Sequence, residues 1–242
     1  MPAARHRPGV GRVAGRRPLV DLRSLVEVVY TVHAPMDLRS ILDSAVPWHP
    51  LATCVETGAA VDLRPYLRQA DDVQVAIRAS AAMPVLAGGP IGLGGRHFYD
   101  GGVAEPIPYR TAMGQGATHV LVLRSRRRDD IPKVSRTTPL FARAALRRYS
   151  HELERAYNHG PVRHAEDDAR LDGMTPNAAA GVALASIRPA PGSPRVGRLA
   201  SDGGLLGEAF EAGRAAVHEV FARMPGRTDA TGCGPFALGS RT

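Results

Sequence analysis

Residues 95–103 read Gly-Arg-His-Phe-Tyr-Asp-Gly-Gly-Val, and this stretch decides how the fold is interpreted. Apolar segments on either side of Gly94-Gly95 predict a β-hairpin, because paired glycines suit a tight hairpin turn. The second strand of this hairpin ends at Asp100. Gly101 and Gly102 follow, and glycine adopts backbone angles that are closed to other residues. The stretch therefore predicts a strand that presents a carboxylate at its end, beside a flexible turn.

Two segments flank this hairpin in a definite order. Upstream, residues 78–84 (Arg-Ala-Ser-Ala-Ala-Met-Pro) end a helix predicted over Asp71–Met83, because proline stops helices. Downstream, residues 105–108 (Glu-Pro-Ile-Pro) begin a helix predicted over Pro106–Gln115, with proline in its first turn. The apolar run His119–Leu123 then predicts a strand that is buried on both faces.

The rest of the chain continues this alternation of helices and strands. Periodicity and turn signals predict further helices and strands, namely helices over Val20–His33, Asp37–Ala45, Pro139–Asn158, His164–Met174 and Leu205–Met224 and strands over Trp48–Glu56, Ala59–Leu63 and Gly181–Arg188. The first two of these strands flank Thr57-Gly58, which predicts a second tight turn. Asp21 and Asp37 stand at the starts of the first two helices and are predicted to cap them. Helices that alternate with strands indicate a layered α/β fold.

In their order, residues 78–84, 95–103 and 105–108 resemble the patatin-like phospholipase family. In that family, a helix ending in an Ala/Ser-rich segment precedes a hairpin that ends in Asp-Gly-Gly or Asp-Gly-Ala, followed by a proline-containing helix start. The resemblance covers roughly Asp21–Arg124 and resumes around Arg195–Phe221. It implies a three-layer α/β fold with a mostly parallel central sheet, here without its first strands.

The resemblance also implies chemistry. It predicts a hydrolase of acyl esters with a Ser-Asp dyad, in which Asp100 takes the proton of the serine hydroxyl and returns it to the leaving alcohol. Gly101 and Gly102 would form the supporting loop, and Ser80 and Pro84 would line the pocket. The implied substrate is a phospholipid or another acyl-ester lipid, and no metal or organic cofactor is implied.

Asp-Gly-Gly taken alone has a simpler interpretation, in which the aspartate only caps the next helix turn. The chain contains a second copy of the tripeptide at Asp202-Gly203-Gly204, which precedes a helix and follows no strand. We expect Asp202 to be a cap without chemistry. The ordered segments around Asp100 favour the catalytic role there.

The serine that Asp100 should serve is missing from this sequence. No Gly-x-Ser-x-Gly motif occurs in it, and Gly9-Val10-Gly11 follows no strand, so it predicts coil rather than an oxyanion loop. Ser80 is disfavoured as a substitute, because no sharp elbow surrounds it. We expect a true start upstream of Met1, with a degenerate protein that keeps a lipid-binding surface as the alternative.

The boundaries of the expected parts follow from composition. Five parts are expected along the chain: a loop or disordered N-terminus at 1–17, the C-terminal part of the hydrolase domain at 18–126, a linker at 127–138, a helical and strand extension packed on that domain at 139–224, and a disordered tail at 225–242. The hydrophobic content of 44% is sufficient for a real core.

The net charge of +8 raises the question of anionic partners. Arginines carry almost all of the basic charge and lack interleaved aromatic residues, so no nucleic acid is expected, and a basic nucleic-acid binder remains the third hypothesis. The cluster Arg124–Arg128 is expected to be a solvated strand exit. The basic helix at 139–158 is expected to cover a sheet, with a membrane-interface helix as the alternative.

Metal and redox signals are weak. Cys54 and Cys233 lie far apart, which predicts neither a disulfide framework nor a metal site. The polar cluster at 159–168 predicts a solvated loop, with a cation site as the alternative. We expect a cytoplasmic protein, with peripheral contact at a membrane.

The absence of a nucleophile motif gives a first prediction. A fluorophosphonate probe, which labels activated serines, should leave this 242-residue chain unlabelled, as intact-protein mass spectrometry would show. An active serine hydrolase in the same reaction serves as the positive control. A covalent adduct on any serine of this chain would contradict the prediction.

Overall fold

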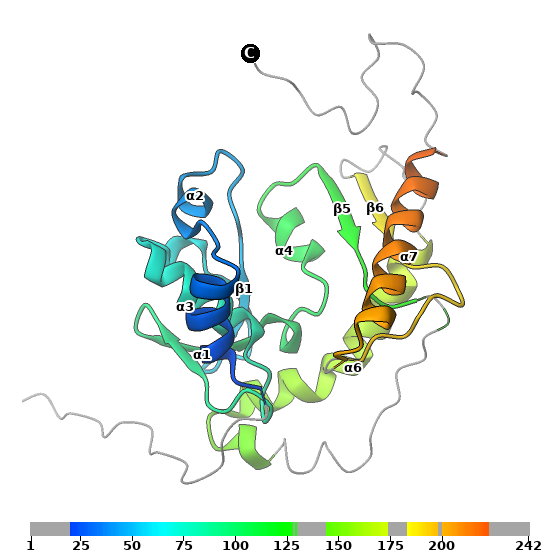
Figure 1. Cartoon of the computed structure of the whole chain (residues 1–242). Coiled ribbons are helices and arrows are strands. Elements are labelled where there is room, and N and C mark those ends of the chain that lie inside the picture. Colours follow the sequence, from blue (N-terminus) through cyan, green and yellow to red (C-terminus); the bar gives the residue numbers. More distant parts are fainter. Residues whose placement is uncertain (1–19, 128, 130–143, 174–182, 198–199, 223–242) are drawn as a thin grey trace, which may run out of the picture. The chain divides into compact units, whose positions relative to one another are not determined.

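The structure is a computed structural model that describes residues 20–127, 129, 144–173, 183–197 and 200–222 (Figure 1). The expected N-terminus at 1–17, the tail at 225–242 and most of the linker at 127–138 lie outside the described residues. The fold is mixed α/β, and the chain divides into two compact units. Met1–Ala104 and Thr137–Asn158 form the first unit, and Glu105–Arg136 and His159–Thr242 form the second.

The first unit is built on a four-stranded sheet. Its strand order is β2-β1-β4-β3, and every neighbouring pair is antiparallel. The strands are β1 (Leu51–Cys54), β2 (Ala60–Asp62), β3 (Ile91–Leu93) and β4 (Arg96–Asp100). Gly94 and Gly95 have φ of 57° and 77°, which suits the tight turn between β3 and β4. Both predicted hairpins are confirmed.

These hairpins also determine the strand direction. The expectation of a mostly parallel central sheet is not met by the four-stranded sheet, because strands joined by short turns pair antiparallel. Parallel pairing occurs in the second unit, where β5 (His119–Leu123) pairs with β6 (Ala183–Ile187). The coarser expectation of an α/β fold is confirmed.

The core of the first unit depends on small side chains. Helix α3 (Ala70–Ala81) packs against the sheet through Val73, Ala76 and Ala79, which are fully buried. Its start is held by a capping box between Gln69 and Asp72. Alanines let the helix approach the strands closely, which agrees with the low aromatic content of the chain.

Two helices at the start of the first unit begin at aspartate caps. Three elements precede the sheet: α1 (Leu22–Ser24), the π-helix η1 (Leu25–His33) and α2 (Leu38–Asp43). Asp21 and Asp37 accept hydrogen bonds from the backbone N–H groups of Ser24 and Ser40, as the sequence predicts. These bonds lower the pKa of the Asp21 carboxyl below its ordinary value. Two 3-10 turns, η2 (Arg64–Tyr66) and η3 (Gly101–Val103), complete the unit.

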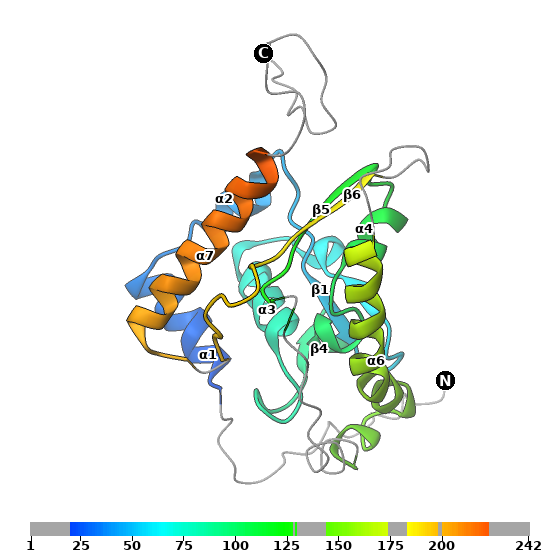
Figure 2. The ribbon, with the colours of Figure 1, turned by 90° about the vertical axis from the view of Figure 1, so that its right-hand side faces the viewer.

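The second unit packs helices against the β5–β6 pair. The helices are α4 (Tyr109–Gly114), α6 (His151–Gly173), which begins in the first unit, and α7 (Gly203–Ala222) (Figure 2). Tyr109, Val122, Leu171 and Leu184 form a buried cluster with Ile107. The strand predicted over His119–Leu123 is confirmed. The expected burial on both faces is wrong, because Val122 is buried whereas Leu121 and Leu123 are exposed.

Helix α6 differs from the sequence prediction. Two separate helices and a solvated loop at 159–168 were expected, but α6 is one helix from His151 to Gly173 with Pro161 inside it. Leu153 is buried near its start and Leu171 near its end. Burial at both ends holds the helix, because tertiary packing supplies most helical stability in proteins.

Arginines at the ends of β5 and β6 bind the acidic face of α6. Arg124 contacts Asp168 at 3.0 Å, and Arg188 contacts Asp172 at 2.8 Å. Asp172 also accepts from Arg124, so one carboxylate joins both strands to the helix. Arg124 was expected at a solvated strand exit, and this expectation is wrong because its side chain is almost fully buried.

This network has a consequence for acid stability. Burial opposes ionisation of Asp172, but hydrogen bonds from Arg124 and Arg188 outweigh it, so the pKa of Asp172 lies below its ordinary value. The carboxylate therefore stabilises the fold at neutral pH. Its contribution is lost as the pH falls below about 4 and through the lowered pKa.

We predict that Asp172→Asn lowers the free energy of unfolding at pH 7 by about 1–2 kcal/mol, because two arginines lose a charged acceptor. Urea unfolding followed by circular dichroism measures the change. Asp43→Asn is the control, since its pair with Arg39 is exposed and should contribute less than about 0.5 kcal/mol. Equal losses in the two variants, or a difference that persists undiminished at pH 3, would argue against this role of Asp172.

Candidate functional site

Asp100 is the last residue of β4 and the N-cap of the 3-10 turn η3. Its Oδ1 accepts a hydrogen bond from the backbone N–H of Gly102 at 2.7 Å. Its own backbone N–H donates to the carbonyl of Ala82 at 2.9 Å, where helix α3 ends. The structure therefore brings the Ala/Ser-rich segment and the Asp-Gly-Gly segment together, as the order of the motifs predicts.

The side chain of Thr53, in β1, fixes the turn that follows Asp100. Its hydroxyl donates to the carbonyl of Asp100 at 2.8 Å and accepts from the backbone N–H of Ala104 at 3.0 Å. Thr53 is fully buried in β1, so a single side chain holds both ends of η3. Thr53 is not among the site residues that were predicted from the sequence. The available signal was a hydroxyl within a buried strand, because a buried polar group requires a partner.

Gly101 and Gly102 are needed for space. Neither has a positive φ, so the expected reason, backbone angles closed to other residues, is wrong for this turn. A Cβ on Gly101 would lie 2.6 Å from the carbonyl oxygen of Leu51, which cannot move away. A Cβ on Gly102 would lie 3.0 Å from Oδ1 of Asp100. The two glycines thus let the turn lie against β1 and beside the carboxylate.

Ser80 and Pro84 lie on either side of the helix end that binds Asp100. Ser80 is partly buried in the last turn of α3, and Pro84 is buried just after it. Between Pro84 and the hairpin, Val85 has a φ of 72°, which is strained for a β-branched residue. The role of Ser80 and Pro84 as pocket lining remains a prediction.

Tyr99 precedes Asp100 in β4, and its side chain is buried. Its ring meets Tyr149 edge to face at 6.0 Å, and its hydroxyl donates to the carbonyl of Gly88 at 3.2 Å. Burial raises the pKa of Tyr99 far above its ordinary value, so the phenol stays neutral. Tyr99 therefore anchors β4 and supplies no charge to the site.

The second Asp-Gly-Gly provides an internal comparison. Oδ1 of Asp202 accepts from the backbone N–H of Leu205 at 2.9 Å, which confirms the prediction that Asp202 caps helix α7. Asp100 also caps a turn, so both aspartates have the capping role that the tripeptide alone predicts. They differ in setting, since Asp202 is exposed whereas Asp100 is half-buried at a strand end.

No protein-family model and no curated protein matches the chain. Within the described residues, no three His, Cys, Asp or Glu side chains are grouped in a way that would hold a metal ion. No helix in the described part of the chain has the length and apolarity needed to span a bilayer. The candidate site consists of Asp100, Gly101, Gly102, Thr53 and Ala82.

The role of Thr53 yields a stability prediction. Thr53→Val keeps the shape of the side chain but removes the hydroxyl that donates to the carbonyl of Asp100 and accepts from the N–H of Ala104. The N–H of Ala104 keeps its second hydrogen bond, to the carbonyl of Gly101 at 3.1 Å. We expect a loss of about 1–3 kcal/mol in the free energy of unfolding. Faster hydrogen exchange at the amide of Ala104 should accompany it.

Thr53→Ser is the matched control, because it keeps the hydroxyl and removes only a methyl group. Its free energy of unfolding should fall by about 1 kcal/mol, and the amide of Ala104 should still exchange slowly. A valine variant as stable and as protected as the natural protein would show that the hydroxyl does not hold this turn.

Proposed function

We propose that this chain is part of a patatin-like acyl-ester hydrolase and that Asp100 is the base of its Ser-Asp dyad. The nucleophilic serine would come from a segment outside this sequence. The proposal rests on one observation: a carboxylate stands at the end of β4, and its turn is held from two sides by Thr53 and Ala82. A general base requires such a fixed position, because proton transfer depends on hydrogen-bond geometry.

The proposed reaction follows from these parts. The serine oxygen attacks the ester carbonyl while Asp100 accepts the hydroxyl proton. Asp100 then returns this proton to the alcohol as the ester bond breaks. Water hydrolyses the acyl-enzyme by the same proton transfers in reverse order, which releases the fatty acid. The substrate that we propose is a phospholipid or another acyl-ester lipid, with peripheral contact at a membrane.

The proposal includes a three-layer fold with a mostly parallel central sheet. The β5–β6 pair supports it, since it is parallel and flanked by helices. On β5, Val122 is buried whereas Leu123 is 70% exposed. Parallel sheets are normally covered on both faces. The exposed side of β5 is consistent with a sheet that further strands and helices complete.

The second candidate is a lipid-binding protein without turnover. The apolar side chains of η1 favour it, because Val28 and Val32 are exposed to solvent. Nucleic-acid binding has less support, since Arg124, Arg127 and Arg188 are engaged in internal hydrogen bonds and contribute little to a basic surface.

The test begins with the coding DNA. We predict an in-frame Gly-x-Ser-x-Gly upstream of the codon for Met1, and hydrolysis of p-nitrophenyl esters by the protein translated from that longer frame. In this protein, Asp100→Asn should lower kcat/KM by about 10²–10⁴, the usual contribution of a general base. Asp202→Asn, in the second Asp-Gly-Gly, is the matched control and should change it less than twofold.

Two results would count against the hydrolase. An upstream frame without the serine motif leaves lipid binding as the better candidate. Full activity in Asp100→Asn would remove the base from the mechanism, whatever precedes Met1.

A further inference from the structure

A groove in the first unit lies on the outside of helix α3. Its volume is about 540 Å³, within the range of small-ligand pockets. Eight residues from η1, α2, α3 and the loops beside them line it: Tyr30, Met36, Ser40, Ile41, Ser44, Val46, Trp48 and Ile77. Asp100, Ser80 and Pro84 are not among them, so the groove is distinct from the candidate active site.

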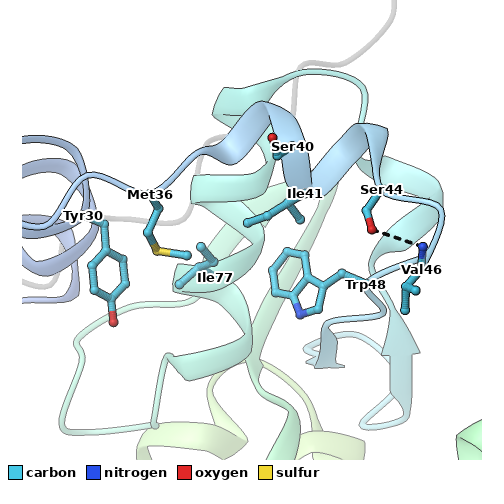
Figure 3. Close-up of a pocket in the computed structure, with 8 residues that line it drawn as sticks. All are labelled: Tyr30, Met36, Ser40, Ile41, Ser44, Val46, Trp48 and Ile77. Carbon is cyan, nitrogen blue, oxygen red and sulfur yellow. Dashed lines mark hydrogen bonds between the residues drawn. The ribbon is translucent and has the colours of Figure 1, made fainter. Parts of the chain in front are cut away.

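The lining is apolar and carries no charge. Met36, Ile41, Val46, Trp48 and Ile77 supply most of it. Figure 3 shows these side chains following one another, from Tyr30 and Met36 at one end to Val46 at the other. Such a row suits an elongated apolar group better than a compact ring.

Two of the three hydroxyl groups of the lining, those of Ser40 and Ser44, take part in hydrogen bonds. Oγ of Ser40 donates to Asp37 at 2.6 Å, and Oγ of Ser44 accepts from the backbone N–H of Val46 at 3.1 Å. Polar groups of a ligand that face Met36, Ile41, Val46 or Ile77 would lose water without gaining a hydrogen bond, at a cost of about 1–3 kcal/mol each. A hydrocarbon chain has no such groups, so the lining favours it.

The walls of the groove also expose apolar surface to water. Met36 is 40% exposed and Val46 is 79% exposed. Covering this surface with an apolar group is favourable by about 25 cal/mol per Å² removed from water. We propose that the groove binds the unbranched hydrocarbon chain of a single amphiphile, whose polar end stays in solvent. This inference stands on the groove alone and does not rest on the proposed hydrolase activity.

Trp48 makes the proposal directly measurable, because it is the single tryptophan of the chain and lines the groove. Bromine quenches tryptophan emission on contact. Titration with 11-bromoundecanol should quench Trp48 in a saturable way, and unbrominated undecanol should reverse the quenching by competition. The short 3-bromopropanol at equal concentration should give only weak, linear quenching. Linear quenching by both bromo-alcohols, without competition, would overturn the proposal.

Two matched variants locate the site. Met36→Glu places a carboxylate on the groove wall, which should weaken binding at least tenfold, since an apolar ligand would desolvate the charge. Val32→Glu places the same charge on η1 outside the groove, at a residue that is 68% exposed, and should change binding less than twofold. If both variants weaken binding equally, the alcohol adsorbs to the outer apolar surface. That result would also overturn the proposal that the groove is the binding site. Circular dichroism verifies that each variant folds, and the competition experiment decides the question in the natural protein.

Discussion

A single buried hydroxyl organises the part of the molecule on which the functional proposal depends. Thr53 bonds the carbonyl at the start of the η3 turn and the amide at its end, and so fixes the turn that begins at Asp100. Gly101 also contributes to the position of the turn. It lies against the backbone of Leu51, and any larger residue there would displace the turn. The turn that carries the Asp100 carboxylate is thus held by Thr53 of β1, which lies 47 residues earlier in the chain.

Local signals in the sequence predicted local structure well. The glycines at 94 and 95 predicted the β3–β4 hairpin, and Asp21, Asp37 and Asp202 predicted three helix caps. The same hairpins require antiparallel pairing, yet the family resemblance led to the expectation of a mostly parallel sheet. Where the two disagreed about this sheet, the short-range geometry was the better guide, since a tight turn leaves no other direction for the returning strand.

Interactions between distant segments were less predictable. The end of α3 lies beside Asp100, where the carbonyl of Ala82 accepts from the backbone N–H of Asp100. The sequence did not reveal the role of Thr53, the burial of Arg124 between two aspartates, or the groove around Trp48. Each depends on side chains from separate elements that meet only after folding. Helix α6 was divided wrongly for a related reason, because packing at both ends carries the helix through Pro161.

The central claim is that the carboxylate of Asp100 activates a serine. The most direct measurement is the rate at which a fluorophosphonate attaches to the serine of the protein translated from the longer reading frame, followed by mass spectrometry. This rate reports activation of the nucleophile separately from the later steps of turnover. We expect attachment to be at least about a hundredfold slower when Asp100 is replaced by asparagine. Equal rates in the two proteins would contradict it.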